Sequence, residues 1–218
     1  MTRKALLLMI LSVAAVLLLP MTAQGRQLRT LQSGDCGLDV QHVNEHLSAD
    51  HFLPPGSHSS CFDDATYYAV IAYQKWYGLD RDGVVGPQTR RAIETRPKPY
   101  LSAKHHPDVD KVVINIKKQV LVEIKHGHLY RIIAVSTGMP GLDTPTGTYS
   151  VFRKERMSWS VPYSSWMPYA SYFNGGIATH QYPEVPTYPA SHGCVRVPAP
   201  FAVQLYHFEV IGMTVQVV

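Results

Sequence analysis

A lone cysteine near the C-terminus follows two histidines. Cys194 ends the tetrapeptide Ser191-His192-Gly193-Cys194, and His180 lies a short distance upstream. A thiol is a weak nucleophile until it ionises, and a nearby imidazole or oriented backbone N–H groups lower its pKa. The glycine beside Cys194 permits a tight turn whose N–H groups converge on one point as an oxyanion hole. The pattern predicts cysteine-based acyl transfer, with a structural Cys194 buried in a strand as the alternative.

The other two cysteines lie together in the N-terminal third of the chain. In an oxidising compartment the simplest pairing joins Cys36 to Cys61. Closing that loop is worth about 3 kcal/mol on the chain-entropy estimate. Cys194 is then a free thiol, which is unusual in an exported protein unless it reacts; intermolecular pairing is the alternative.

Residues 1–25 have the pattern of an export signal. Arg3 and Lys4 precede an apolar run at 5–19, and small residues at 23–25 supply a cleavage site. The apolar run is shorter than the roughly 20 residues that a bilayer span needs. We therefore expect an exported mature protein in the cell wall or periplasm with no membrane span; a retained N-terminal anchor is the alternative.

The composition is that of a globular protein with a nearly neutral surface. The 218 residues are 45% hydrophobic and 17% charged. The formal charge is +4, and removal of the signal leaves 18 basic against 16 acidic residues. This balance argues against nucleic acid as a partner. No phosphate-binding glycine motif is present, so we expect no nucleotide cofactor, and a monomer is the default.

The elements that must position these residues fall into two parts. Residues 35–95 have helical periodicity, with a second helix expected at 66–77 that ends at Gly78 and a third that starts at Gly86-Pro87. A stiff, polar linker follows at 96–107. Residues 108–218 change to period two, and the expected fold class is α+β: a small three-helix domain, then a mostly-β domain. Strands are expected at 112–116, 119–124, 129–135, 148–152, 176–179 and 213–218, and a helix at 200–208.

Eight aromatic residues crowd the segment from Trp159 to Tyr188. Proline and glycine interrupt the segment, so we interpret it as a loop that frames a cleft. Tyrosine and tryptophan suit a groove that is both apolar and hydrogen-bonding. A core position for about half of these rings is the alternative.

The helical part resembles a known wall-binding module. Its segment Ala72 to Leu79, followed by Asp82-Gly83-Val84-Val85-Gly86-Pro87-Gln88-Thr89, is similar to the second half of the three-helix peptidoglycan-binding domain. The first half, around Asp39-Val40, fits less closely. The resemblance implies binding to peptidoglycan; glycan, peptide or only the neighbouring domain remain open as the ligand of this domain.

The C-terminal part resembles the L,D-transpeptidase catalytic domain of the YkuD type. The resemblance rests on His180-Gln181, an intervening loop and Ser191-His192-Gly193-Cys194-Val195-Arg196, together with the upstream turn Thr144-Pro145-Thr146-Gly147. It spans roughly residues 108–218. It implies that Cys194 attacks the carbonyl of residue three of a stem tetrapeptide, with His180 as general base. Release of D-Ala leaves a thioester, and an amine acceptor then gives a 3→3 cross-link, an activity of cell-wall biogenesis and cell shape.

The resemblance gives the remaining residues supporting roles. Gly193 and Cys194 N–H groups, with His192, hold the oxyanion, and Ser191 shapes the turn. Arg196 and Tyr172 contact the substrate; the alternative for Arg196 is a structural salt bridge. No Ser follows His180, so the group that orients this base is unassigned.

Neither a metal nor an organic cofactor is expected. His42 and His46 have helical spacing but lack an HExxH pattern, and His126/His128 and His105-His106 fit a hairpin tip and the linker. Two other functions remain open. One is an L,D-carboxypeptidase that passes the acyl group to water, and the other is a non-catalytic wall-binding protein with an inert Cys194.

Overall fold

A computed structural model describes residues 29–100 and 109–218, so the signal expected at 1–25 and most of the linker lie outside the described residues. The N-terminal part consists of three helices: α1 (Leu38–Ala49), α2 (Asp64–Tyr77) and α3 (Pro87–Thr95). The carboxylate of Asp63 caps α2 by accepting a 2.8 Å hydrogen bond from Thr66 N, and Gly78 ends it with φ 67°. A disulfide joins Cys36 to Cys61 just outside α1 and α2.

Buried Gln74 gives a structural reason for the residue pattern that resembles the peptidoglycan-binding domain. Its side-chain amide donates to Asp82 Oδ1 (2.7 Å) and Thr89 Oγ1 (3.1 Å) and accepts from Gly83 N (2.9 Å). One side chain on α2 therefore fixes both the following turn and the start of α3. Gly83 has φ 72°, and a Cβ there would lie 2.1 Å from the ring of Tyr67. No other residue fits this turn without moving the ring.

The C-terminal part contains two sheets and one helix. The five-stranded sheet has the order β3-β2-β1-β9-β4 and the four-stranded sheet the order β5-β6-β7-β8. Helix α4 (Ala199–Phe208) packs on β6 and β7. The strands are β1 (Lys111–Asn115), β2 (Val120–Lys125), β3 (His128–Ala134), β4 (Gly147–Ser150), β5 (Arg153–Ser160), β6 (Ser165–Asn174), β7 (Ile177–Gln181), β8 (Val195–Val197) and β9 (Thr214–Val217).

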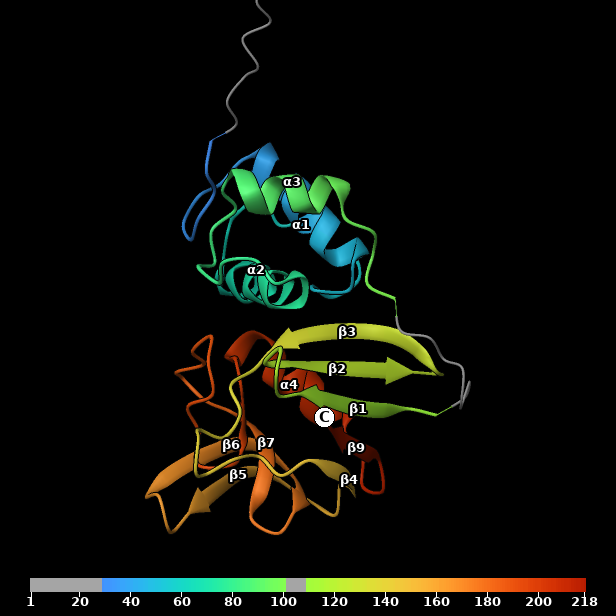
Figure 1. The fold of residues 1–218 in the computed structure, drawn as a ribbon, viewed down its shortest axis with the longest axis vertical. Helices are drawn as coiled ribbons and strands as arrows, with labels where there is room; N and C mark the ends of the chain where they lie inside the picture. The colour runs from blue at the N-terminus through green and yellow to red at the C-terminus, as the bar shows by residue number, and fades with distance from the viewer. Residues whose placement is uncertain (1–28, 101–108) are drawn as a thin grey trace, which may run out of the picture.

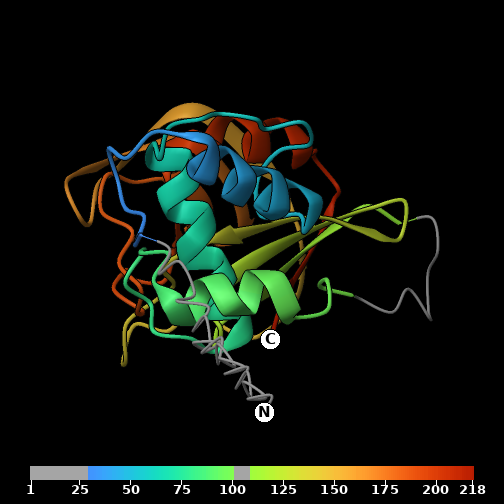
Figure 2. The ribbon, with the colours of Figure 1, turned by 90° about the horizontal axis from the view of Figure 1, so that it is seen from above.

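The helical domain lies against the five-stranded sheet, with α2 packed on β3, and the four-stranded sheet lies at the opposite end of the molecule (Figure 1). Seen from above, the three helices cover the sheet (Figure 2). Apolar side chains of both parts, among them Phe52, Tyr73 and Ile132, belong to one continuous core. The α+β prediction is confirmed: three helices precede a mostly-β domain, and the fourth helix is the one expected at 200–208.

The loop predicted from Trp159 to Tyr188 is wrong for most of its length. Strands β5 and β6 form a long antiparallel hairpin there, whereas β7, which continues the sheet, is the strand expected at 176–179. Pro168 is tolerated because β6 pairs with β7 only from Ser171 onward, so Pro168 has a paired strand on one side alone. The glycines expected in a loop, Gly175 and Gly176, form the turn between β6 and β7. Fewer of the eight aromatic rings are in the core than the half that the alternative expected: Tyr172 and Phe173 are buried, whereas Trp159, Tyr163, Trp166 and Tyr188 are exposed.

Candidate active site

Cys194 lies on a turn that leads directly into β8. Gly193 has φ 113°, a backbone conformation that side chains disfavour. Ser191 Oγ accepts from Gly193 N (3.1 Å) and donates to Cys194 O (2.5 Å). From outside the turn, Thr144 Oγ1 donates to Gly193 O at 2.8 Å. Hydrogen bonds thus hold the backbone on both sides of the thiol.

The Gly193 N–H was expected to be free for an oxyanion, but it donates to Ser191 Oγ in this structure. His192 does not point back into the turn: its ring stacks on that of Tyr163, with centroids 4.2 Å apart and planes at 12°. The stack connects the turn at residues 191–194, here called the catalytic turn, to the tip of the β5–β6 hairpin.

His180 lies on β7 and is only 4% exposed. Its Nδ1 lies 2.8 Å from Gln181 O. A carbonyl oxygen only accepts, so in the neutral imidazole Nδ1 carries the proton and Nε2 keeps its lone pair. The orienting group that the sequence left unassigned is therefore the backbone carbonyl of the next residue. No side-chain pattern encodes such a contact, so the sequence held no signal for it.

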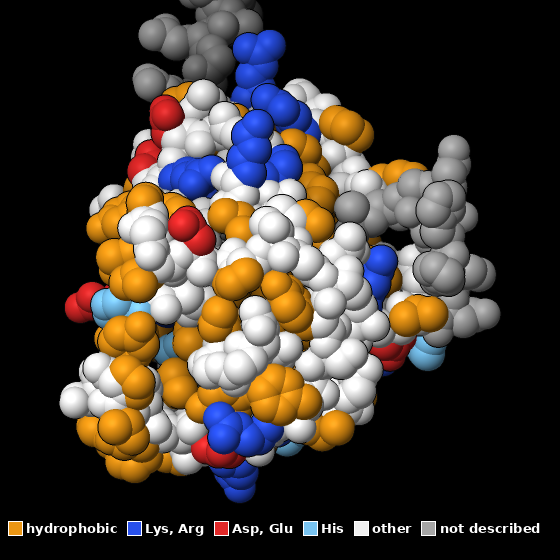
Figure 3. All heavy atoms as spheres, turned by 60° about the horizontal axis from the view of Figure 1, so that its bottom comes forward, with side chains coloured by type: hydrophobic (Ala, Val, Ile, Leu, Met, Phe, Trp, Pro, Cys, Tyr) orange, Lys and Arg blue, Asp and Glu red, His pale blue; other side chains and the backbone are white. Residues whose placement is uncertain are grey.

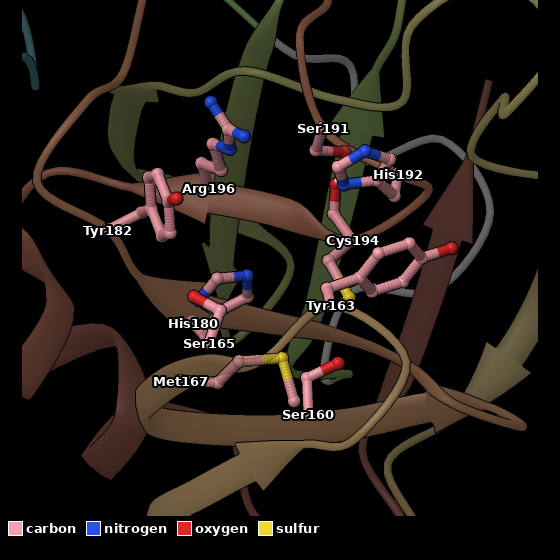
Figure 4. Close-up of a pocket in the computed structure, with 10 residues that line it drawn as sticks. All are labelled: Ser160, Tyr163, Ser165, Met167, His180, Tyr182, Ser191, His192, Cys194 and Arg196. Carbon is pink, nitrogen blue, oxygen red and sulfur yellow. The ribbon is translucent and has the colours of Figure 1, made fainter.

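Parallel pairing of β7 with β8 brings the two reactive side chains to one pocket. The register sets Thr179 opposite Val195 and His180 opposite Arg196, so Cys194 enters the sheet next to the strand that carries His180. Figure 4 shows the imidazole and the Cys194 sulfur lining the same hollow. The loop between the two strands is long, but strand pairing rather than loop length sets this proximity.

Both reactive groups are neutral near pH 7. Burial, opposed by the hydrogen bond to Gln181 and assisted by the charge of Arg196, lowers the pKa of His180 to about 4. Burial raises the pKa of the Cys194 thiol. A hydrogen bond to the Ala178 backbone and the charge of Arg196 offset only part of this increase. The thiol lies 3.7 Å from Gly176 O. The resting site holds a neutral thiol and a neutral imidazole rather than an ion pair.

The pocket is open to solvent on one side, and the centres of water molecules can occupy about 90 Å³ of it. Its walls come from the hairpin, from β7 and from the catalytic turn (Figure 4). It is lined by Ser160, Tyr163, Ser165, Met167, His180, Tyr182, Ser191, His192, Cys194 and Arg196.

Exposed apolar side chains lie on the face of the hairpin opposite the pocket residues. Met157, Trp159 and Trp166 are each between 46% and 58% exposed, and the two indoles pack edge to face with centroids 5.0 Å apart. Figure 3, which looks from this end, shows hydrophobic side chains gathered on the surface. Ser160, Ser165 and Met167 are pocket residues that sequence reasoning missed, because it placed no strands here.

Arg196 has an unneutralised guanidinium at the edge of the pocket. It lies over the ring of Tyr182 at 4.2 Å, and its NH1 donates to the backbone oxygen of Glu184 at 3.4 Å. Within the described ranges, no carboxylate forms a salt bridge with it. Its charge is thus available to an anionic ligand.

Tyr172, expected to contact substrate, is 3% exposed and does not line the pocket. Its hydroxyl lies 2.7 Å from Ser158 Oγ across the hairpin, and the guanidinium of Arg153 covers its ring at 3.8 Å. The structure gives it a packing position, which corrects the expectation.

A buried carboxyl lies behind His180. Glu209, at the end of α4, is 1% exposed, and its Oε2 accepts a 2.6 Å hydrogen bond from Thr179 Oγ1. Glu209 Oε1 and the nearby hydroxyl of Ser171 have no partner among the described residues. Burial raises the pKa of Glu209 to about 7.

Across residues 29–100 and 109–218, no three His, Cys, Asp or Glu side chains are grouped as a metal site. The His42 and His46 rings pack edge to face at 4.5 Å. His105-His106 lies outside the described residues.

Within residues 29–100 and 109–218, no helix is long and apolar enough to cross a membrane.

Comparison with known families assigns both parts of the chain. The family described as the YkuD L,D-transpeptidase catalytic domain matches residues 110–217, and the one described as a putative peptidoglycan binding domain matches residues 36–93. Comparison with curated proteins gave no match.

Two solved structures are similar over most of their length. An L,D-transpeptidase of Xylanimonas cellulosilytica is 32% identical with a TM-score of 0.78, and the likeness covers 87% of this chain and 98% of that one. An L,D-transpeptidase of Stackebrandtia nassauensis is 26% identical with a TM-score of 0.52, over 88% of this chain and 97% of the other. With the catalytic-domain family matching residues 110–217 and this likeness over nearly the whole of a solved chain, the protein belongs to the L,D-transpeptidase family.

Proposed function

We propose that the protein is an exported peptidoglycan L,D-transpeptidase that forms 3→3 cross-links in the cell wall. Residues 1–25 direct export, residues 35–95 dock on the wall, 96–107 link the domains, and 108–218 carry out catalysis. The observation that carries the proposal is the meeting of Cys194 and His180 in one pocket of an L,D-transpeptidase fold. Family membership supports peptidoglycan as the partner.

In the first half-reaction the Cys194 sulfur attacks the carbonyl of residue three in a stem tetrapeptide. The thiol proton passes to Nε2 of His180, the lone-pair nitrogen that the Gln181 contact leaves free. Because both groups are neutral at rest, this transfer accompanies the attack rather than preceding it. The imidazolium then protonates the departing amine, D-Ala leaves, and a thioester remains on Cys194.

The oxyanion is held by N–H groups of the turn at Gly193 and Cys194. The Gly193 N–H exchanges its 3.1 Å bond to Ser191 Oγ for a stronger one to the charged oxygen. His192, stacked on Tyr163, closes the pocket on the hairpin side. Arg196 pairs with a stem carboxylate, since no protein carboxylate in the described ranges occupies it.

In the second half-reaction the side-chain amine of residue three on a neighbouring stem attacks the thioester. His180 accepts a proton from this amine, and the sulfur leaves as the thiol. No step needs a metal or an organic cofactor. Water in place of the amine gives the L,D-carboxypeptidase reaction.

The test is a product and intact-mass assay. Residues 26–218 are incubated with a disaccharide tetrapeptide, beside a Cys194→Ala variant of the same chain. We expect loss of D-Ala and a covalent dimer in the wild type only. Tripeptide without dimer identifies a carboxypeptidase, and an unchanged substrate with folded, reduced protein favours the wall-binding protein.

A further inference from the structure

Three cations donate to backbone carbonyls across the boundary between the two domains, in addition to the shared apolar core and the hydrogen bond from Ile132 N to His51 O at 2.8 Å. Lys75 Nζ donates to Val135 O at 2.8 Å, Arg81 NH1 to Thr187 O at 2.8 Å, and Lys118 Nζ to Trp76 O at 2.5 Å. No salt bridge among the described residues joins the domains. Charged donors to a carbonyl form stronger hydrogen bonds than neutral donors, so these contacts fix the docked position.

The Lys75 contact lies at the start of a segment that supports the catalytic turn. After Val135, Ser136 N donates to Arg196 O at 3.1 Å, and Arg196 N donates back to Ser136 O at 2.9 Å. Thr137 O then accepts from Ser191 N at 3.0 Å. Buried Lys75 therefore holds the strand end whose next two residues bind both flanks of Cys194.

The Arg81 contact lies on the loop between His180 and Ser191, here called the substrate loop (residues 182–190). The catalytic domain binds this loop from within: Ser136 Oγ donates to Tyr188 O at 2.7 Å, and Ala190 N donates to Thr137 O at 2.9 Å. Arg81, from the α2–α3 connection of the helical domain, binds it from outside at Thr187. The loop lies between the two domains.

The substrate loop in turn positions pocket groups. Tyr182, its first residue, supports the guanidinium of Arg196, and Glu184 O accepts from that guanidinium. Tyr182 also packs edge to face on His180, with centroids 5.8 Å apart. Without the Arg81 contact, the substrate loop no longer holds Tyr182 and Arg196 in fixed positions. Ordering the loop when substrate binds then costs free energy and lowers the affinity.

We propose that the helical domain is a structural part of the active site and that Arg81 is a positioning residue for the substrate loop. Wall attachment alone does not require this contact, because a tethered anchor works from a flexible linker. The inference rests on the proposed function only for the identity of the substrate.

The test compares Arg81→Ala with Arg91→Ala in the otherwise intact mature chain. Arg91 is an exposed arginine on α3, in a surface hollow of the helical domain alone, and is the matched control. The substrate is a soluble disaccharide tetrapeptide, which removes any effect of polymer attachment. For loss of one charge-assisted hydrogen bond we expect KM for D-Ala release to rise about tenfold in Arg81→Ala.

Three further readouts separate positioning from general damage. The alkylation rate of Cys194 with iodoacetamide is expected to stay at the wild-type value, because the turn itself keeps its hydrogen bonds. The Tm is expected to fall by only the few degrees that loss of one hydrogen bond explains. Arg81→Lys is expected to recover most of the lost affinity, since it restores one cationic donor. An unchanged KM in Arg81→Ala, or an equal rise in Arg91→Ala, overturns the proposal.

Amide hydrogen exchange gives a test that does not depend on activity. Without the outer contact, we expect the amides of Ala190 and Ser191 to exchange about tenfold faster in Arg81→Ala than in the wild type. Equal protection in the two proteins overturns the positioning role. A wild type that releases no D-Ala overturns the proposed function instead, and the exchange result still decides the role of Arg81.

Discussion

The imidazole of His180 is oriented by the carbonyl oxygen of Gln181, 2.8 Å from Nδ1. A side-chain carboxylate at this position would raise the basicity of the ring and favour the imidazolium. A neutral carbonyl fixes the tautomer with a smaller effect on the charge state. The base is thus oriented by its own strand, and burial keeps it uncharged.

The pH dependence of catalysis follows from that burial. The pKa of His180 is lowered to about 4, so the imidazole remains a free base as the pH falls through the range where an ordinary histidine, with pKa about 6.5, becomes protonated. We expect kcat/KM to stay level between about pH 5 and 7 and to fall only near pH 4. A pH–rate profile with an acidic limb near 6.5 would contradict a buried, neutral base.

Replacing each histidine in turn identifies the general base. His180→Gln removes the proton acceptor, and we expect kcat to fall by about 10² to 10⁴. His192→Gln is the matched control: it loses a ring stack on Tyr163 that is worth about 1 kcal/mol, so we expect a change of about tenfold or less. The alkylation rate of Cys194 is measured alongside and is expected to fall only in His180→Gln. The reverse ranking would make His192 the base.

Arg196 is expected to determine affinity for an anionic stem. Arg196→Met keeps much of the aliphatic length but loses the charge, and we expect KM for the tetrapeptide to rise about 10- to 100-fold through loss of a charge-assisted pair. Arg153→Met is the control, because Arg153 also covers a tyrosine ring but lies outside the pocket. If amidating the stem carboxylates lowers affinity for wild type and Arg196→Met equally, Arg196 does not bind them.

Glu209 is expected to make stability depend on pH. Its pKa is raised to about 7 in the folded protein against about 4.3 in an unfolded chain, so folding favours the protonated acid. The stabilising effect is complete below about pH 4 and is lost as the pH rises to about 7, by at most about 4 kcal/mol. Glu209→Gln, which is always neutral, is expected to gain stability relative to wild type between pH 5 and 8. Urea unfolding across this range measures it, and a constant difference would show that Glu209 does not titrate there.

The parts of the fold that the sequence predicts are those whose signals are local. Helix α2 has a capping carboxylate before it, a buried stripe along it and Gly78 after it, so each boundary has its own residue. The β1–β3 strands are apolar, β-branched runs between turns. The signals for these segments lie within the segments themselves, so a pattern along the chain is sufficient to find them.

The β5–β6 hairpin could not be predicted in this way. Pro168 argues against a strand unless its second side has no paired strand. Whether that side is free depends on where β7 begins to pair with β6, which the sequence does not give. The same limit applies to the site. Residue types point to Cys194 and His180, whereas the hydroxyl of Thr144 donates to a backbone oxygen of a distant turn and Gln181 acts through its own backbone oxygen. The expectation that Tyr172 contacts substrate is wrong for a related reason. An aromatic residue type alone does not tell which side of a strand faces the pocket.

The acceptors at the domain boundary are main-chain oxygens, and every sequence supplies those. Val135 and Thr187 can therefore change identity among homologues without loss of the contact, while Lys75 and Arg81 cannot. Among relatives with the same two domains, we expect the cations at positions 75 and 81 to be retained. The residues whose carbonyl oxygens they contact, at 135 and 187, are expected to vary freely. Paired substitutions, the usual trace of an interface, are expected to be absent at these two contacts.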